Sequence, residues 1–172
     1  MTPMRLRPIA LCAALGAALV TGPGLPADAQ GISFGGIRAD ASLPVEITAD
    51  RLNVDEATGM AVFSGNVVVV QGAMRMAAAR LEVEYEDGTD RRRIRRLHAT
   101  GGVTLVNAAD AAESREATYA PATGQVVMTG DVVLTQGPSV MSGQRLDVDL
   151  TTGTGRMGGR VRTVIAPSGA PE

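Results

Sequence analysis

The feature that most constrains this chain is an internal repeat: residues 50–85 match residues 115–150 at a constant offset of 65 positions, without a gap. Ala57-Thr58-Gly59 recurs as Ala122-Thr123-Gly124. Likewise, Arg80-Leu81-Glu82-Val83 recurs as Arg145-Leu146-Asp147-Val148. Self-similarity at a fixed period indicates that one supersecondary unit is used more than once along the chain.

A shorter period lies inside this repeat. A Gly-X-Val motif occurs at spacings of 36, 29 and 29 residues, beginning at Gly65, Gly101, Gly130 and Gly159. A second set of small or apolar residues recurs at spacings of 29, 36 and 29, at Leu52, Leu81, Ala117 and Leu146. We therefore predict that each repeat unit forms two strands. One unit carries seven extra residues, which fall within 86–96.

Each unit alternates between apolar and polar residues, the period-two signature of a half-buried β-strand, although Val62, Val68 and Val70 interrupt the polar side. Segment 80–85 shows the pattern most clearly, and 145–150 repeats it. In the Gly-X-Val strands the Gly falls on the apolar side, where it leaves no side chain to pack and predicts a bend or bulge. Gly59 and Gly124 instead predict hairpin turns. We therefore expect an all-β, antiparallel fold of about ten or more short strands, wrapped around an aliphatic lining.

The ends of the chain differ from this repeat. Residues 1–29 have the form of a cleaved signal peptide, with Arg5 and Arg7 before an apolar stretch at 9–20 and Ala27-Asp28-Ala29 at its end. Twelve apolar residues are too few to span a bilayer, so we expect the leader to be removed. We predict cleavage before Gln30, directly after Ala27-Asp28-Ala29. A flexible lead-in over 30–43, a β-domain over 44–165 and a disordered tail over 166–172 would follow.

Composition argues against several function classes. The net charge of -2 and pI near 5.5 disfavour nucleic acid as a partner, because no basic surplus could neutralise phosphates. His98 is the single histidine and falls on a polar strand face. Neither metal-binding spacing nor a phosphate-cradling Gly-rich loop before a helix occurs. We therefore predict no catalytic residues, no metal and no cofactor, and a protein that is not an enzyme.

One basic cluster interrupts the pattern, inside the seven-residue expansion. It consists of Arg91, Arg92, Arg93, Arg95 and Arg96. Acidic residues flank it, which is typical of a solvated hairpin that carries its own counter-ions. The alternative is that these guanidinium groups contact phosphates or an acidic partner, because their forked geometry suits both.

Two segments carry a family resemblance. The run 44–52 (PVEITADRL), followed by 63–67 (FSGNV), resembles the LptA (OstA-like) family of lipopolysaccharide transport proteins, over roughly residues 44–160. The motifs at 101–103, 130–132 and 146–150, with Tyr119, fall where that family repeats its own. The chain departs from the pattern at Gly102, where Asn is usual.

The resemblance implies a periplasmic, non-enzymatic carrier with a twisted β-jellyroll fold, open at both ends. Its apolar groove would hold the acyl chains of lipid A while lipopolysaccharide passes from the inner membrane to the outer-membrane assembly site. Its partners would be an inner-membrane anchored jellyroll protein and the jellyroll domain of an outer-membrane translocon. Its ends would also allow head-to-tail homo-oligomers.

The residues that could line the groove share the apolar side of the strands. They are Leu52, Val54, Phe63, Val67, Val69, Met76, Leu81, Val83, Val103, Leu105, Val132, Leu134, Met141, Leu146 and Val148. The same residues could form a closed core. Two other functions stay open: a self-assembling structural β-protein and, if the leader is retained, the anchored partner of the same transport system.

Overall fold

The computed structural model describes residues 32–33, 43–55, 57–86, 93–107 and 110–165. They form eleven strands: β1 (Ile32–Ser33), β2 (Glu46–Thr48), β3 (Arg51–Asp55), β4 (Met60–Gln71), β5 (Met74–Tyr85), β6 (Ile94–Asn107), β7 (Asp110–Ala120), β8 (Gln125–Gln136), β9 (Ser139–Asp149), β10 (Thr154–Gly158) and β11 (Arg162–Ile165). Within this part of the chain no helix is long and apolar enough to cross a membrane.

All strands belong to one antiparallel sheet with the order β1-β10-β9-β8-β7-β6-β5-β4-β2. Two strands lie off this path: β3 pairs with β4 beside β2, and β11 pairs with β9 beside β10. From β3 to β10, strands that follow one another in sequence pair with each other in the sheet, joined mostly by tight hairpins, whereas β1 pairs with β10 and β2 with β4. The antiparallel all-β prediction is confirmed, although the six central strands are not short and span 11–14 residues each.

The central strands are long because the Gly-X-Val motifs bend a strand without ending it. Two consecutive residues with positive φ oppose a single residue on the neighbouring strand, as Gly101 and Gly102 oppose Ala79. A Cβ added to Gly101 would lie 2.7 Å from the Ala79 Cβ, so only glycine fits there. The same two-residue bulge recurs at 65–66 and 130–131, and residues 159–160, which also have positive φ, lie in the connection between β10 and β11. The predicted bends are therefore confirmed.

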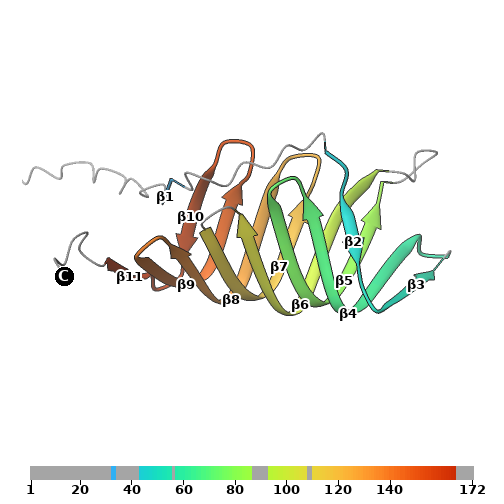
Figure 1. Ribbon diagram of the computed structural model, residues 1–172, viewed down its shortest axis with the longest axis horizontal. Helices are drawn as coiled ribbons and strands as arrows, with labels where there is room; N and C mark the ends of the chain where they lie inside the picture. Colours follow the sequence, from blue (N-terminus) through green and yellow to red (C-terminus); the bar gives the residue numbers. More distant parts are fainter. Residues whose placement is uncertain (1–31, 34–42, 56, 87–92, 108–109, 166–172) are drawn as a thin grey trace, which may run out of the picture.

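These bends lie along the lower edge of Figure 1, while hairpin turns lie along the upper edge. Each central strand is thus divided into two limbs, and the limbs form two layers. We call the limbs 60–64, 80–85, 94–100, 116–120, 125–129 and 145–149, with β3 and β10, layer A. We call the limbs 67–71, 74–78, 103–107, 110–114, 132–136 and 139–143, with β2 and β11, layer B.

The core lies between the two layers. Inward side chains from both layers are almost fully buried, among them Leu81 and Met128 of layer A and Leu105 and Leu134 of layer B. A single sheet with an open face could not bury them, so the layers must pack against each other. Figure 1 shows the molecule elongated across the strands, with β3 near one end and β11 near the other.

The predicted ends fall largely outside the described residues. The signal peptide at 1–29 and the tail at 166–172 lie wholly outside them. Within the predicted lead-in at 30–43, Ile32–Ser33 form β1, which pairs with Gly155 and Thr154 of β10. The predicted turns at Gly59 and Gly124 are present, each with positive φ.

Candidate functional site

The apolar sides of the strands line the space between the layers, as the alternation predicts. Twelve of the fifteen candidate groove residues are buried there: Val67, Val69, Met76, Leu81, Val83, Val103, Leu105, Val132, Leu134, Met141, Leu146 and Val148. Phe63 is half-buried and packs against this core. The interior is thus a continuous aliphatic surface that crosses all six central strands.

Leu52 and Val54 differ from the other candidates. They share the inward facing, since Leu52 pairs with Phe63 and Val54 with Ala61, but their side chains are 53% and 64% exposed. The reason is topological: in the described residues β3 pairs with β4 alone, at the end of the sheet. Opposite them, at the other end of the sheet, Val164 and Ile165 of β11 are 53% and 73% exposed. Both ends of the fold therefore present apolar side chains beside open strand edges.

A polar row inside layer B was not predicted. Four polar side chains of the described residues are buried: Gln71, Asn107, Asp110 and Ser114, all on limbs of layer B. Gln136 Nε2 donates a 3.1 Å hydrogen bond to Asp110 Oδ2, whereas Asn107 Nδ2 and Oδ1 have no hydrogen-bond partner among the described residues. The sequence signal for Gln71, Asn107 and Asp110 is a polar side chain at an inward position next to a hairpin turn, whereas Ser114 lies beside the bend of β7.

Gln71 links the two layers. Its Oε1 accepts a hydrogen bond from the Tyr119 hydroxyl of layer A, and its Nε2 donates to the Leu43 carbonyl oxygen at 2.9 Å. Both side chains are at most 1% exposed. Burial raises the pKa of Tyr119 to about 12, so its hydroxyl remains a proton donor at neutral pH. The sequence shows no sign of this pair, which is 48 residues apart.

A cavity of about 400 Å3 lies above this pair, at the edge where the hairpin turns are. Leu43, Val45 and Gln71 line it from the side of layer B. From the side of layer A the lining residues are Glu86, Arg93, Ile94, Pro121 and Ala122. We call this space the mouth cavity, because it lies between the two layers and its floor is the buried interior.

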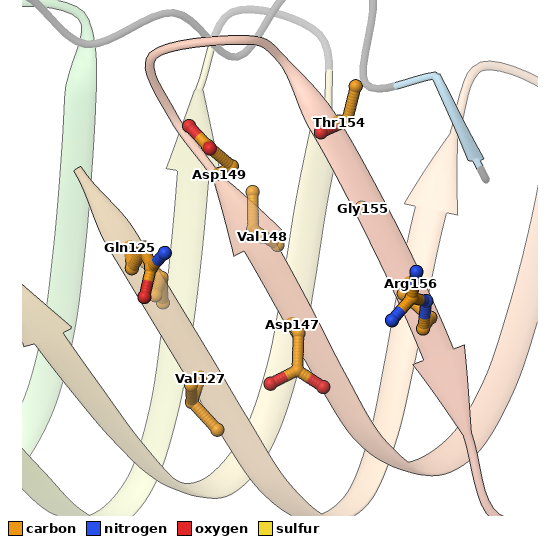
Figure 2. Close-up of a pocket in the computed structure, with 9 residues that line it drawn as sticks. Gln125, Val127, Asp147, Val148, Asp149, Thr154, Gly155 and Arg156 are labelled. Carbon is orange, nitrogen blue, oxygen red and sulfur yellow. The ribbon is translucent and has the colours of Figure 1, made fainter. Parts of the chain in front are cut away.

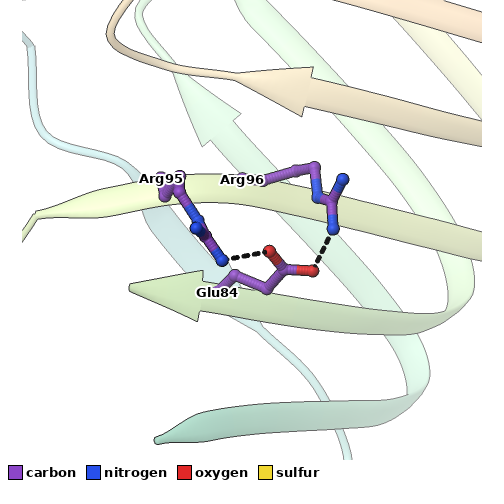
Figure 3. Close-up of polar contacts among 3 residues, drawn as sticks. All are labelled: Glu84, Arg95 and Arg96. Carbon is purple, nitrogen blue, oxygen red and sulfur yellow. Dashed lines mark hydrogen bonds and ion pairs between the residues drawn. The ribbon is translucent and has the colours of Figure 1, made fainter. Parts of the chain in front are cut away.

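The basic cluster is divided. Arg91 and Arg92 lie outside the described residues, and Arg93 borders the mouth cavity. Arg95 and Arg96 both donate to the carboxylate of Glu84, Arg95 at 3.0 Å, on the outer surface of layer A (Figure 3). The hydrogen bond from Arg96, with desolvation opposing it, holds the pKa of Glu84 below its usual value of 4.5. This arrangement matches the counter-ion interpretation for Arg95 and Arg96.

A second depression, of about 420 Å3, lies on β8, β9 and β10 (Figure 2). Its acidic groups already have partners: Asp147 is bound by Arg145 at 2.6 Å, and Asp149 accepts the backbone N–H of Thr151 at 2.8 Å. Hydrogen bonds from Thr151 and Thr152 hold the pKa of Asp149 below its usual range. We therefore interpret Asp147 and Asp149 as residues that stabilise β9 and the turn that follows it.

His98 lies on the outer side of layer A, with Nε2 4.0 Å from Glu116 Oε2. In the part of the chain that the structure describes, no three His, Cys, Asp or Glu residues are grouped so that they could hold a metal ion. The arrangement that distinguishes this molecule is thus an apolar interior between two layers, a polar row along one wall and a mouth cavity above it.

Comparisons with known proteins agree with this architecture. Residues 46–154 match the family model described as "LptA/(LptD N-terminal domain) LPS transport protein". An uncharacterized protein of Rhizobium meliloti (strain 1021) is 30% identical over 164 residues, which cover 90% of this chain and 88% of that protein. The fold is similar to the crystal structure of LptH from Pseudomonas aeruginosa, described as the LptA homologous periplasmic component of the lipopolysaccharide transport device. The TM-score is 0.66 at 18% identity, and the match covers 75% of this chain and 99% of LptH. The chain therefore belongs to the LptA/(LptD N-terminal domain) family of lipopolysaccharide transport proteins.

Proposed function

We propose that this protein is a periplasmic carrier that holds the acyl chains of lipopolysaccharide between layers A and B. It would pass the lipid from the inner membrane to the outer-membrane assembly site. The observation that carries this proposal is the continuous aliphatic interior, with exposed apolar side chains at both ends of the sheet. Family membership supports the choice of lipid.

The energetics favour such a ligand. Each methylene group that leaves water for an apolar interior contributes about 0.8 kcal/mol. The apolar side chains of the interior are aliphatic or methionine apart from Phe63, Tyr85 and Tyr119, and flexible Met74, Met76 and Met128 can repack around a chain. Loading requires the two layers to separate, because side chains fill the interior when no lipid is bound.

The exposed ends support the second half of the proposal, transfer to partners of the same fold. β3 and β11 are edge strands that carry exposed apolar residues, and such edges pair readily with strands of another chain. An inner-membrane anchored jellyroll protein at one end and an outer-membrane translocon at the other would form a continuous apolar path through this chain.

Native mass spectrometry of the mature chain with lipopolysaccharide tests the proposal. We expect one lipid to bind per chain, or per subunit of an assembly. We also expect slower hydrogen exchange of the interior strands when lipid is bound. No uptake under conditions where the chain is folded would contradict the carrier function.

The same edges favour a second candidate, a self-assembling structural β-protein. This function predicts polymers that form without lipid and carry none at stoichiometric levels. Substituting Leu52 and Ile165 with Lys at the two edges should then abolish assembly, and lipid binding would be absent throughout.

Periplasmic location depends on the predicted leader. We expect the exported protein to begin at or near Gln30, which N-terminal sequencing of a periplasmic extract would check. A chain that retains Met1 and sediments with the inner membrane would instead support the anchored partner of the same transport system.

A further inference from the structure

The mouth cavity has the character of a site for one end of an amphipathic molecule. Leu43, Val45, Ile94 and Pro121 give it apolar walls, while Glu86 and Arg93 border it with charge. Its volume of about 400 Å3 lies within the range of cavities that hold small organic ligands. It contains none of the groove residues predicted from the sequence.

The cavity adjoins the buried interior. Gln71 is one of its lining residues and occupies the last inward position of β4, next in that alternation to the buried Val69. Pro121 and Ala122 follow Tyr119 by two and three residues, in the turn between β7 and β8. The Gln71–Tyr119 hydrogen bond therefore crosses from layer B to layer A beneath the cavity, where a ligand moving inward would meet it.

This hydrogen bond is neutral, buried and made between two strands that do not pair with each other, β4 and β7. It thus holds the two layers together rather than strengthening one of them. Moving the layers apart would break it, and both groups would then need other partners. A linkage of this kind resists opening but can be remade when the layers close again.

We propose that the mouth cavity is the lateral port through which an acyl chain enters the interior, and that Gln71 and Tyr119 form the latch that closes it. The port rests on the proposed lipid-carrier function and deepens it, because it assigns where the chain enters and which groups oppose its entrance. Lipid could then load along the side of the sheet, independently of the open ends at β3 and β11.

Stopped-flow uptake of fluorescently labelled lipopolysaccharide by the mature full-length chain tests the latch. Tyr119→Phe removes the hydroxyl and keeps the ring, and Gln71→Met removes the amide and keeps the length. We expect Tyr119→Phe to speed uptake by about two- to tenfold, the effect of one hydrogen bond. Gln71→Met should speed uptake at least as much, because it also removes the hydrogen bond to the Leu43 carbonyl oxygen. The double variant should be no faster than the faster single variant, because both remove the same interaction. Thr118→Val, which removes a hydroxyl from the adjacent outward position of β7, is the matched control and should leave the rate unchanged.

A second pair of variants tests the port. Ala122→Trp places an indole in the mouth cavity from an exposed turn position, and we expect it to slow uptake by about tenfold or more. Ala77→Trp is the control, because Ala77 lines a hollow of about 420 Å3 on the outer face of layer B, away from the interior.

The outcomes separate the two proposals. If wild-type chain takes up lipid and the Tyr119 and Gln71 variants, shown to be folded by their thermal midpoints, take it up at the wild-type rate, the latch is wrong while the carrier function stands. Unchanged uptake by Ala122→Trp would overturn the port in the same way. A wild-type chain that takes up no lipid overturns both the carrier function and the port.

Discussion

Layers A and B both line the interior with aliphatic side chains, but they differ in their outer faces and in the polar side chains that they bury. The outer face of layer A is charged, with Arg80, Glu82, Glu84, Arg96, Glu116, Arg145, Asp147, Asp149 and Arg156. The outer face of layer B across the central strands is mostly small and neutral, with Val68, Val70, Ala77, Thr104, Val106, Ala111, Val133, Thr135, Val140 and Ser142 beside the charged Arg75 and Glu113.

The inner faces differ in the opposite sense. Layer A buries only apolar residues and Tyr119, whereas layer B buries the polar row that contains Gln71, Asn107 and Asp110. Packing therefore determines which residues occupy the inward positions of the repeated strands, while the polarity of the outward positions differs between the layers. The difference teaches that the shared interior, and not either outer face, is what the repeat preserves.

The largest expected effect tests whether the two inner faces are equivalent. Leu134 of layer B and Met128 of layer A are both 0% exposed, and we expect Leu134→Asp and Met128→Asp each to lower the free energy of unfolding by about 4 kcal/mol, because an unpaired carboxylate would be buried. Thr135→Asp and Thr129→Asp, one residue away on the outer faces, should change it by about 0.5 kcal/mol or less. Urea denaturation measures all four. An outer-face variant that loses more than its inner neighbour would reverse the assigned facing.

The next effect tests the bends that separate the layers. Gly101 and Gly102 both have φ of +85°, but a Cβ at Gly101 would meet Ala79, whereas one at Gly102 meets nothing within 4 Å. We expect Gly102→Ala to cost about 1 kcal/mol from backbone strain and Gly101→Ala to cost about 2–3 kcal/mol from strain plus the clash. Thermal unfolding of both variants compares them. Equal losses of stability in the two variants would mean that backbone strain alone accounts for the cost of a side chain at the bend.

A smaller effect of opposite sign tests the polar row of layer B. Asn107 is fully buried and its amide has no partner in the part of the chain that the structure describes, so Asn107→Leu should raise the free energy of unfolding by about 1 kcal/mol in the absence of lipid. Asn107→Asp is the control and should destabilise, because it adds a second carboxylate beside Asp110. Destabilisation by Asn107→Leu would show instead that the amide is satisfied in solution.

The smallest effect tests the charged face of layer A. Interaction with Arg96 and Arg95 lowers the pKa of Glu84 below 4.5, so the ion pairs stabilise the fold above that pH, and this stabilisation is lost as the pH falls through the pKa of Glu84 in the folded protein. We expect Glu84→Gln to lower the free energy of unfolding by about 0.5 kcal/mol at pH 7, and the difference from wild type to vanish at lower pH. Glu113→Gln, at a position of layer B without an ion pair to the described residues, should show no such pH dependence. A difference that grows as the pH falls would contradict the assignment.

Particular residues show what the sequence could predict. The facing of Leu81 and Leu146 and the bend at Gly65 follow from local alternation and from the absence of a side chain, so both could be predicted. The exposure of Leu52 depends on the position of β3 at the end of the sheet, which the order of strands decides. The Gln71–Tyr119 pair depends on how far the sheet folds back on itself. Local sequence patterns contain neither the order of the strands nor the extent to which the sheet folds back.

The proposal that lipid lies between the layers is tested most directly by photo-crosslinking from two adjacent positions of β4. Phe63 faces inward and is half-buried, while Val62 faces outward, so p-azidophenylalanine at each position samples opposite sides of the same strand. With lipopolysaccharide bound, we expect crosslinks from position 63 and none above background from position 62. Crosslinks from position 62 alone, or equal yields from both positions in folded protein, would contradict the account.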